Sequence, residues 1–126
     1  MFDHIDFAVT DFDKSRAFYT AVLSPLGIES FMEIDREDGR KGVGFGSDDG
    51  PQLWTGGGPA VEGRLHIAFA AGSHAAVDAF HQAALEAGGT SYGAPGLRSQ
   101  YAENHYAAFV SDPDGNVIEA VCRGSA

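Results

Sequence analysis

The feature that most constrains the fold of this chain is an internal repeat. Residues 4–9 read HIDFAV and residues 66–71 read HIAFAA, an offset of 66 − 4 = 62, and the same offset places Gly27 over Gly89. A chain of 126 residues is the size of one compact domain. The repeat therefore predicts that a single domain is assembled from two copies of a smaller unit.

Each copy begins with a strand followed by a helix. Residues 5–9 alternate large apolar side chains with smaller or polar ones, which is the period of a strand with two different faces. Asp11 then supplies an N-cap, and apolar residues follow at helical spacing until Gly27. In the second copy Ser73 is the expected N-cap, and Gly88 and Gly89 end the helix. Strand and helix are thus predicted in the same order twice.

Shorter strand-like runs follow each helix. They are expected at residues 28–34, 42–46 and 52–55 in the first copy, and at 90–92, 105–110 and 116–121 in the second, with a loop over 93–104. The prediction is an α+β fold in which two tandem βαβββ modules form a cupped mixed sheet with the helices outside. The single domain covers residues 1–126, with module one at 1–57, a Gly- and Pro-rich linker at 58–63 and module two at 64–122.

Strand alternation predicts a metal site. If the large apolar residues of the first strand pack under the helix, His4 faces the other side of the sheet, and His66 does the same in the second copy. Glu119 interrupts an otherwise apolar last strand, where an unpaired carboxylate is costly. These three side chains are expected to bind one divalent ion (Zn, Ni, Fe or Mn), with the carbonyl oxygen of Gln52 as a weaker fourth ligand. The alternative for His4 alone is an ordinary hydrogen-bonded strand histidine.

Five further residues are predicted to bind the substrate. Asp6 lies on the same face as His4, as a proton acceptor or a group that supports the metal ligands, or else faces solvent. Trp54 supplies an apolar wall to the cavity or belongs to the core. Arg98, Tyr101 and His105 lie in or just after the expected loop, where they border the pocket mouth or form an ordinary surface loop.

Composition excludes several classes of partner. The formal net charge of −10 repels phosphate backbones and anionic membranes, so no nucleic acid and no membrane is expected as a partner. The single cysteine, Cys122, permits no disulfide within the chain. The sequence contains no long apolar run and no signal-like start, which predicts a cytoplasmic, soluble protein.

Taken together, these motifs resemble those of a known family. The run HIDFAVTD at 4–11, Phe18-Tyr19, HIA at 66–68 and DPDGN at 112–116 before Ile118-Glu119 are similar to the vicinal oxygen chelate superfamily. That family contains glyoxalase I, extradiol dioxygenases, fosfomycin-resistance enzymes and bleomycin-resistance proteins. The resemblance covers nearly the whole chain and implies the two-module fold, but one fold of this kind supports many chemistries.

The resemblance also implies a ligand set. The glyoxalase-like metal positions fall on His4, Gln52, His66 and Glu119, and similar bacterial glyoxalases have Glu where this chain has Gln52. The remaining His, His, Glu set is similar to the iron triad of extradiol dioxygenases. The implied activity is that of a metal-dependent lyase, isomerase or dioxygenase on a substrate that chelates the ion through vicinal oxygens. Since Gln cannot act as a base, Glu119 would be both ligand and catalytic base.

Two other functions stay open at this point. A metal-free protein resembling the bleomycin-resistance members would bind a small molecule without chemistry, and an acidic chain suits a cationic ligand. The third possible function is that of a regulatory or structural dimer with a vestigial pocket. The resemblance implies a homodimer in each case. The sequence leaves open whether each site is built from one chain or from two.

Overall fold

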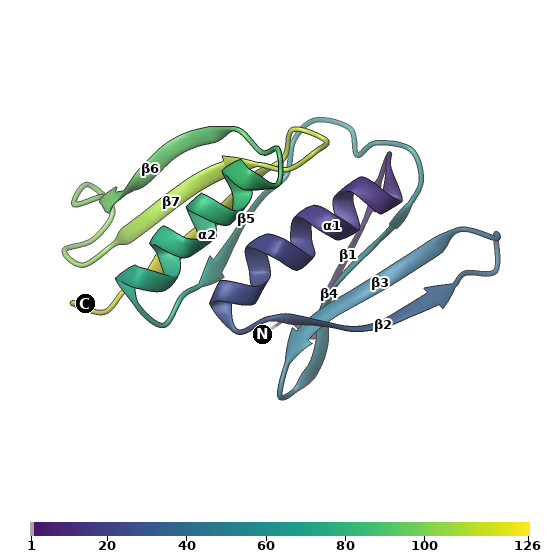
Figure 1. Ribbon diagram of the computed structural model, residues 1–126, viewed down its shortest axis with the longest axis horizontal. Helices are drawn as coiled ribbons and strands as arrows, with labels where there is room; N and C mark the ends of the chain where they lie inside the picture. Colours follow the sequence, from purple (N-terminus) through teal and green to yellow (C-terminus); the bar gives the residue numbers. More distant parts are fainter. Residues whose placement is uncertain (1) are drawn as a thin grey trace.

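The computed structural model describes residues 2–126, which form two repeated sets of strands and helices (Figure 1). The first set comprises β1 (Ile5–Val9), α1 (Phe12–Leu23), the short 3-10 helix η1 (Ser24–Leu26), β2 (Glu29–Asp35), β3 (Lys41–Ser47) and β4 (Gly50–Gly57). The second comprises β5 (His66–Ala70), α2 (His74–Glu86), β6 (Ser91–Leu97), β7 (Tyr106–Ser111) and β8 (Val117–Cys122). Apart from η1, the two sets have the same element order.

The strands of each module form one mixed sheet. Their orders are β1-β4-β3-β2 and β5-β8-β7-β6, so the second sheet repeats the first with every number raised by four. In both sheets the first strand pairs in parallel with the last, and the remaining pairs are antiparallel. The predicted α+β fold of two βαβββ modules is confirmed.

Local sequence signals set the helix boundaries. The Asp11 side chain accepts a hydrogen bond from the Lys14 backbone N–H at 3.1 Å, and the Ser73 hydroxyl accepts one from the Ala76 N–H at 3.1 Å. Both predicted N-caps are therefore present. Gly27 ends η1 with φ of +77°, a conformation that glycine adopts without a Cβ penalty. None of the helices in residues 2–126 has the length and apolar character to span a bilayer.

The loop expected at 93–104 begins later than the sequence indicated. Strand β6 extends to Leu97 through the run Gly-Ala-Pro-Gly, and its register against β7 shifts twice, between Ser91 and Gly93 and between Gly93 and Gly96. Because β6 is an edge strand, Pro95 need not donate to a neighbour on both sides, and bulges of this kind are tolerated at edges. The glycine and proline positions alone therefore predicted the wrong boundary between strand β6 and the loop.

The helices cover one face of each sheet and leave the other open. Figure 1 shows α1 and α2 side by side, each packed on the sheet of its own module. Phe7 and Val9 point to the helix side and are buried. Opposite them, the N-terminal open face presents His4, Asp6, Ile34, Gln52 and Trp54. The C-terminal open face presents His66, Phe109, Val117, Glu119 and Val121.

A hydrogen-bonded contact joins the modules on the helix side. The Tyr19 hydroxyl of α1 donates to Asp112 Oδ2 at 2.5 Å, and the Thr10 N–H donates to Asp114 Oδ2 at 3.0 Å. Both carboxylates belong to the turn between β7 and β8, which Gly115 closes with φ of +87°. Burial, and then the nearby Asp112 carboxylate, raise the pKa of Tyr19 well above its ordinary value. The phenol is therefore a neutral donor.

Candidate functional site

The C-terminal open face brings a carboxylate between two imidazoles. His66 opens β5 and Glu119 lies in the middle of β8, the parallel neighbour of β5. Glu119 Oε1 is 2.9 Å from His66 Nε2, and its Oε2 is 3.2 Å from His105 Nε2. An ionised carboxylate only accepts hydrogen bonds, so in this arrangement both Nε2 atoms carry the hydrogen.

The three side chains differ in their exposure. The Glu119 and His105 side chains are 7% and 9% exposed, whereas that of His66 is 55% exposed. Oε2 is thus fixed from the interior by His105, while Oε1 points toward the exposed imidazole. A buried carboxylate is tolerated when charge-assisted hydrogen bonds compensate its lost hydration. Oε1 of Glu119 is the atom that a ligand on this face would meet.

Aromatic rings surround this cluster. The Phe109 ring lies in an edge contact with His66, with 6.0 Å between centroids, and the Tyr101 ring is 5.1 Å from that of His105. His105 Nδ1 is buried and has no hydrogen-bond partner among residues 2–126. Of the three residues predicted near the pocket mouth, His105 and Tyr101 therefore adjoin the Glu119 cluster directly.

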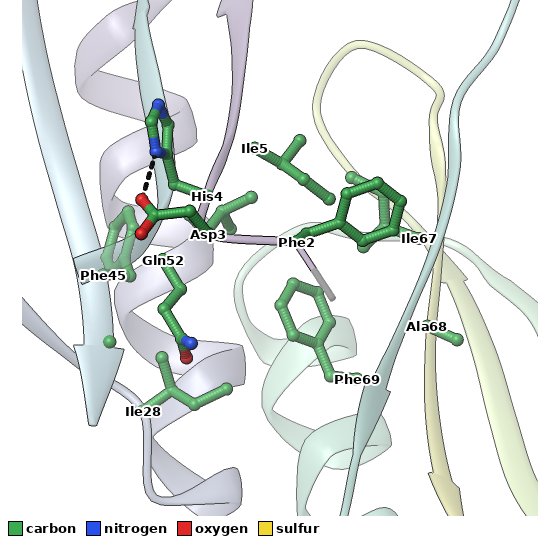
Figure 2. A pocket seen from close by; sticks show the side chains of 12 residues that line it. Phe2, Asp3, His4, Ile5, Ile28, Phe45, Gln52, Ile67, Ala68 and Phe69 are labelled. Carbon is green, nitrogen blue, oxygen red and sulfur yellow. Dashed lines mark hydrogen bonds and ion pairs between the residues drawn. The ribbon is translucent and has the colours of Figure 1, made fainter. Parts of the chain in front are cut away.

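His4 and Gln52 lie on the other sheet. They line a cavity of about 220 Å³ together with Phe2, Ile28 and Phe45 from the first module and Ile67 and Phe69 from the second. Figure 2 shows His4 and Gln52 on one side of this cavity, with Ala68 and Phe69 opposite. The His4 side chain is 54% exposed, and its Nδ1 lies 2.7 Å from Asp3 Oδ1.

The four predicted metal ligands therefore form two pairs, one on each open face. Within residues 2–126, no group of three or more His, Cys, Asp or Glu side chains is arranged to hold a metal ion. The two sheets share no ladder of hydrogen bonds, and the modules pack against each other mainly through α1, η1 and α2. The complete ligand set therefore stays a prediction.

The other predicted residues of the first module form a polar network on the N-terminal open face. Arg36 donates from Nη1 to Asp6 Oδ2 at 3.1 Å and from Nη2 to Asp6 Oδ1 at 3.2 Å. Its guanidinium lies over Gly42, and the Trp54 ring covers Gly44, where a Cβ would come within 2.9 Å of the indole. Asp6 is thus hydrogen-bonded to an arginine that the sequence did not predict as its partner.

Arg36, Phe109 and the link between His105 and Glu119 were not predicted from the sequence. Strand alternation offered a signal for one of them, since Phe109 in β7 shares parity with His105 just before that strand and pairs with Glu119 across the β7–β8 ladder. Arg36 lies outside the strands, so periodicity says nothing about its direction.

Comparison with known proteins identifies the family to which the chain is similar. The family model described as Glyoxalase/Bleomycin resistance protein/Dioxygenase superfamily matches residues 1–120. A glyoxalase/bleomycin resistance protein from Albidiferax ferrireducens T118 is 32% identical, with 97% of this chain and 98% of that chain covered and a TM-score of 0.72. A search of curated proteins finds no match to the chain.

Two further solved structures are similar in fold at lower identity. The fosfomycin resistance protein FosX from Listeria monocytogenes is 17% identical, with 97% of this chain and 90% of that chain covered and a TM-score of 0.68. A glyoxalase I variant from Zea mays is 22% identical over 95% of this chain and 43% of that chain, with a TM-score of 0.70. Likeness at this level extends to the fold alone.

Proposed function

Because the chain belongs to the Glyoxalase/Bleomycin resistance protein/Dioxygenase superfamily, we propose that it is a metal-dependent enzyme acting on a small molecule with vicinal oxygens. The observation that carries the proposal is the buried Glu119 carboxylate beside the exposed His66 imidazole on the C-terminal open face. The reaction type is glyoxalase-like isomerisation or lysis, or dioxygenation. Superfamily membership supports this range of activities.

The residues fit a divalent ion in their chemistry. With bonds of about 2.1 Å to nitrogen and oxygen, two ligands at a right angle are about 3.0 Å apart, and His66 Nε2 and Glu119 Oε1 are separated by 2.9 Å. His66 would bind through Nε2 with its hydrogen moved to Nδ1. The His105 donor to Oε2 supports the ligand from behind, as outer partners of metal ligands do.

We propose that the remaining ligands come from a second copy of the chain. His4 and Gln52 lie on the N-terminal open face, and a homodimer that places this face against the C-terminal open face of its partner would unite both pairs. Apolar side chains at the rims support such an association, since Met32, Ile34 and Tyr92 are 51%, 38% and 51% exposed. Each cavity would then be built from two chains.

Within such a site the bound ion would supply Lewis-acid polarisation of two substrate oxygens. Glu119 Oε1 would both bind the ion and accept a proton, because Oε2 is held by the buried His105. Gln52 has no ionisable group, so it contributes a carbonyl oxygen and no base. Trp54 supplies a flat apolar wall, held by its contact with Gly44.

Metal content tests the proposal directly. The full chain is expressed in media containing zinc, nickel, iron or manganese, and the bound metal is measured after gel filtration. Wild-type protein is expected to retain one ion per site, and His66→Ala and Glu119→Gln are expected to lose it. His81→Ala is the matched control, since His81 lies on α2 and contacts Ser91 Oγ at 2.8 Å. Equal metal content in all four proteins would remove the basis of the proposal.

A metal-free binding protein is the second candidate. It is favoured by the fact that Glu119 already accepts hydrogen bonds from both His66 and His105 within one chain. In that case a small molecule would bind equally well before and after treatment with a chelator. Sedimentation of the full chain tests the proposed dimer, and a monomer would remove the cavity built from two chains.

A further inference from the structure

Equivalent arginines have different partners in the two modules. Arg36 directly follows β2 and Arg98 directly follows β6, and their offset, 98 − 36 = 62, equals the offset between His4 and His66. Arg36 is paired through two hydrogen bonds with the Asp6 carboxylate. The same offset places Ala68 at the position of Asp6, since 6 + 62 = 68. The second module therefore keeps the arginine and lacks its carboxylate.

The Arg98 guanidinium lies over Gly93 and Gly96, and one hydrogen bond to the protein uses one of its donors. A Cβ added to Gly96 would lie 3.0 Å from Nη1, and one added to Gly93 would lie 3.1 Å from Nη2. Arg98 Cζ is 5.5 Å from the centroid of the Phe109 ring, and Nη2 donates to the Ala94 carbonyl at 2.6 Å. A guanidinium has five N–H donors. Among residues 2–126, no carboxylate lies within ion-pair distance of it.

A second arginine borders the same region. Arg64 Cζ is 5.7 Å from the centroid of the Tyr92 ring, and these two residues line a shallow pocket with Phe109 and Val117. The Glu119 carboxylate of the C-terminal open face is already hydrogen-bonded to two imidazoles. In a chain with a net charge of −10, this part of the surface concentrates cationic groups and aromatic rings.

We propose that Arg98 and Arg64 form a subsite for a carboxylate group of the ligand, whose apolar body packs on Phe109 and Tyr92. A planar guanidinium binds a carboxylate through two parallel hydrogen bonds, and Asp6 on Arg36 is an example of this pairing within the same chain. The inference rests on the proposed function, since it takes the C-terminal open face as the ligand surface. The Phe109 ring contacts His66, so a carboxylate held here lies beside the Glu119 cluster.

Three probes with the same ring distinguish the contribution of charge to binding affinity from that of packing. Benzoate, benzamide and benzamidine carry charges of −1, 0 and +1 on the same ring, and each is titrated into chelator-treated full chain while backbone NMR shifts are followed. Benzoate is expected to bind about tenfold or more tightly than benzamide, because charge-assisted hydrogen bonds are worth about 1.5–3 kcal/mol. Its affinity is expected to fall as salt is raised.

Arginine variants assign the effect to the subsite. Arg98→Gln is expected to weaken benzoate about tenfold or more, and Arg98→Lys to restore part of the loss, because the charge returns without the planar fork. Arg64→Gln is expected to cause a smaller loss. Arg40→Gln is the matched control, since Arg40 pairs with Asp38 in the first module, and it is expected to bind benzoate like wild type.

The proposal is overturned if benzoate shows no saturable binding, if Arg98→Gln binds it as tightly as wild type, or if benzamidine binds more tightly than benzoate. Chelator treatment separates these outcomes from those of the metal experiment. Metal retention without benzoate binding rejects the carboxylate subsite alone. Benzoate binding without metal retention rejects the metal-dependent enzyme and leaves the subsite in place.

Discussion

Replacing Tyr19 by Phe tests the contact that joins the two modules. The change removes one hydroxyl from a fully buried position and keeps the ring, which packs edge to face against Phe18 with 5.2 Å between centroids. The lost hydrogen bond runs to Asp112 Oδ2, which also accepts from Asn116 Nδ2 at 3.0 Å. The carboxylate therefore keeps partners, and the damage is confined to one charge-assisted hydrogen bond.

The expected loss of unfolding free energy in Tyr19→Phe follows from that geometry. A hydrogen bond to a charged group contributes about 1.5–3 kcal/mol, and the remaining donors to Asp112 place Tyr19→Phe at the lower end, about 1.5–2 kcal/mol. With a urea m-value of about 1.5 kcal/mol/M, the midpoint falls by about 1 M. Tyr106→Phe is the control: its hydroxyl donates to Asp78 at 2.6 Å near the surface, and a loss within about 0.5 kcal/mol is expected.

The pH dependence provides a second measurement on the same variant. Because the folded-state pKa of Tyr19 is raised, the folded chain holds this proton more tightly than the unfolded chain. The resulting stability is fully present below the unfolded pKa of about 10 and is lost as the pH rises through 10 toward the folded pKa. The difference in unfolding free energy between wild type and Tyr19→Phe should therefore shrink above pH 10. A variant as stable as wild type at pH 8, or a difference that grows at high pH, would refute this reasoning.

Three further substitutions probe other parts of the fold by urea unfolding. Ser73→Ala removes the N-cap of α2 and should cost about 1 kcal/mol, with Ser73→Asp near wild type; an equal loss in both would contradict a capping role. Gly89→Ala should cost about 1–3 kcal/mol, because the new Cβ would lie 2.9 Å from the Ser111 backbone oxygen, and a neutral result would show that the backbone moves freely there. His105→Ala leaves the buried Glu119 with one fewer donor and should cost about 1–3 kcal/mol; unchanged stability would mean that water replaces the imidazole.

Much of this molecule was readable from local patterns in the sequence. The repeat at an offset of 62 predicted two βαβββ modules, and the side chains of Asp11 and Ser73 marked the helix starts because capping depends only on residues three positions away. Strand alternation placed His66 and Glu119 on one face of one sheet, where they are in contact. Within a sheet, period and register together decide which side chains are neighbours.

Contacts between separate parts of the chain were decided only by the tertiary structure. Alternation says which face a side chain occupies but not which other face lies opposite it, so it could not place the pair His4 and Gln52 relative to the pair His66 and Glu119. Arg36 reaches Asp6, and Tyr19 reaches Asp112, across 30 and 93 residues of sequence. Such pairings follow from how helices and sheets pack in three dimensions, and side-chain packing between modules leaves no periodic trace in the sequence.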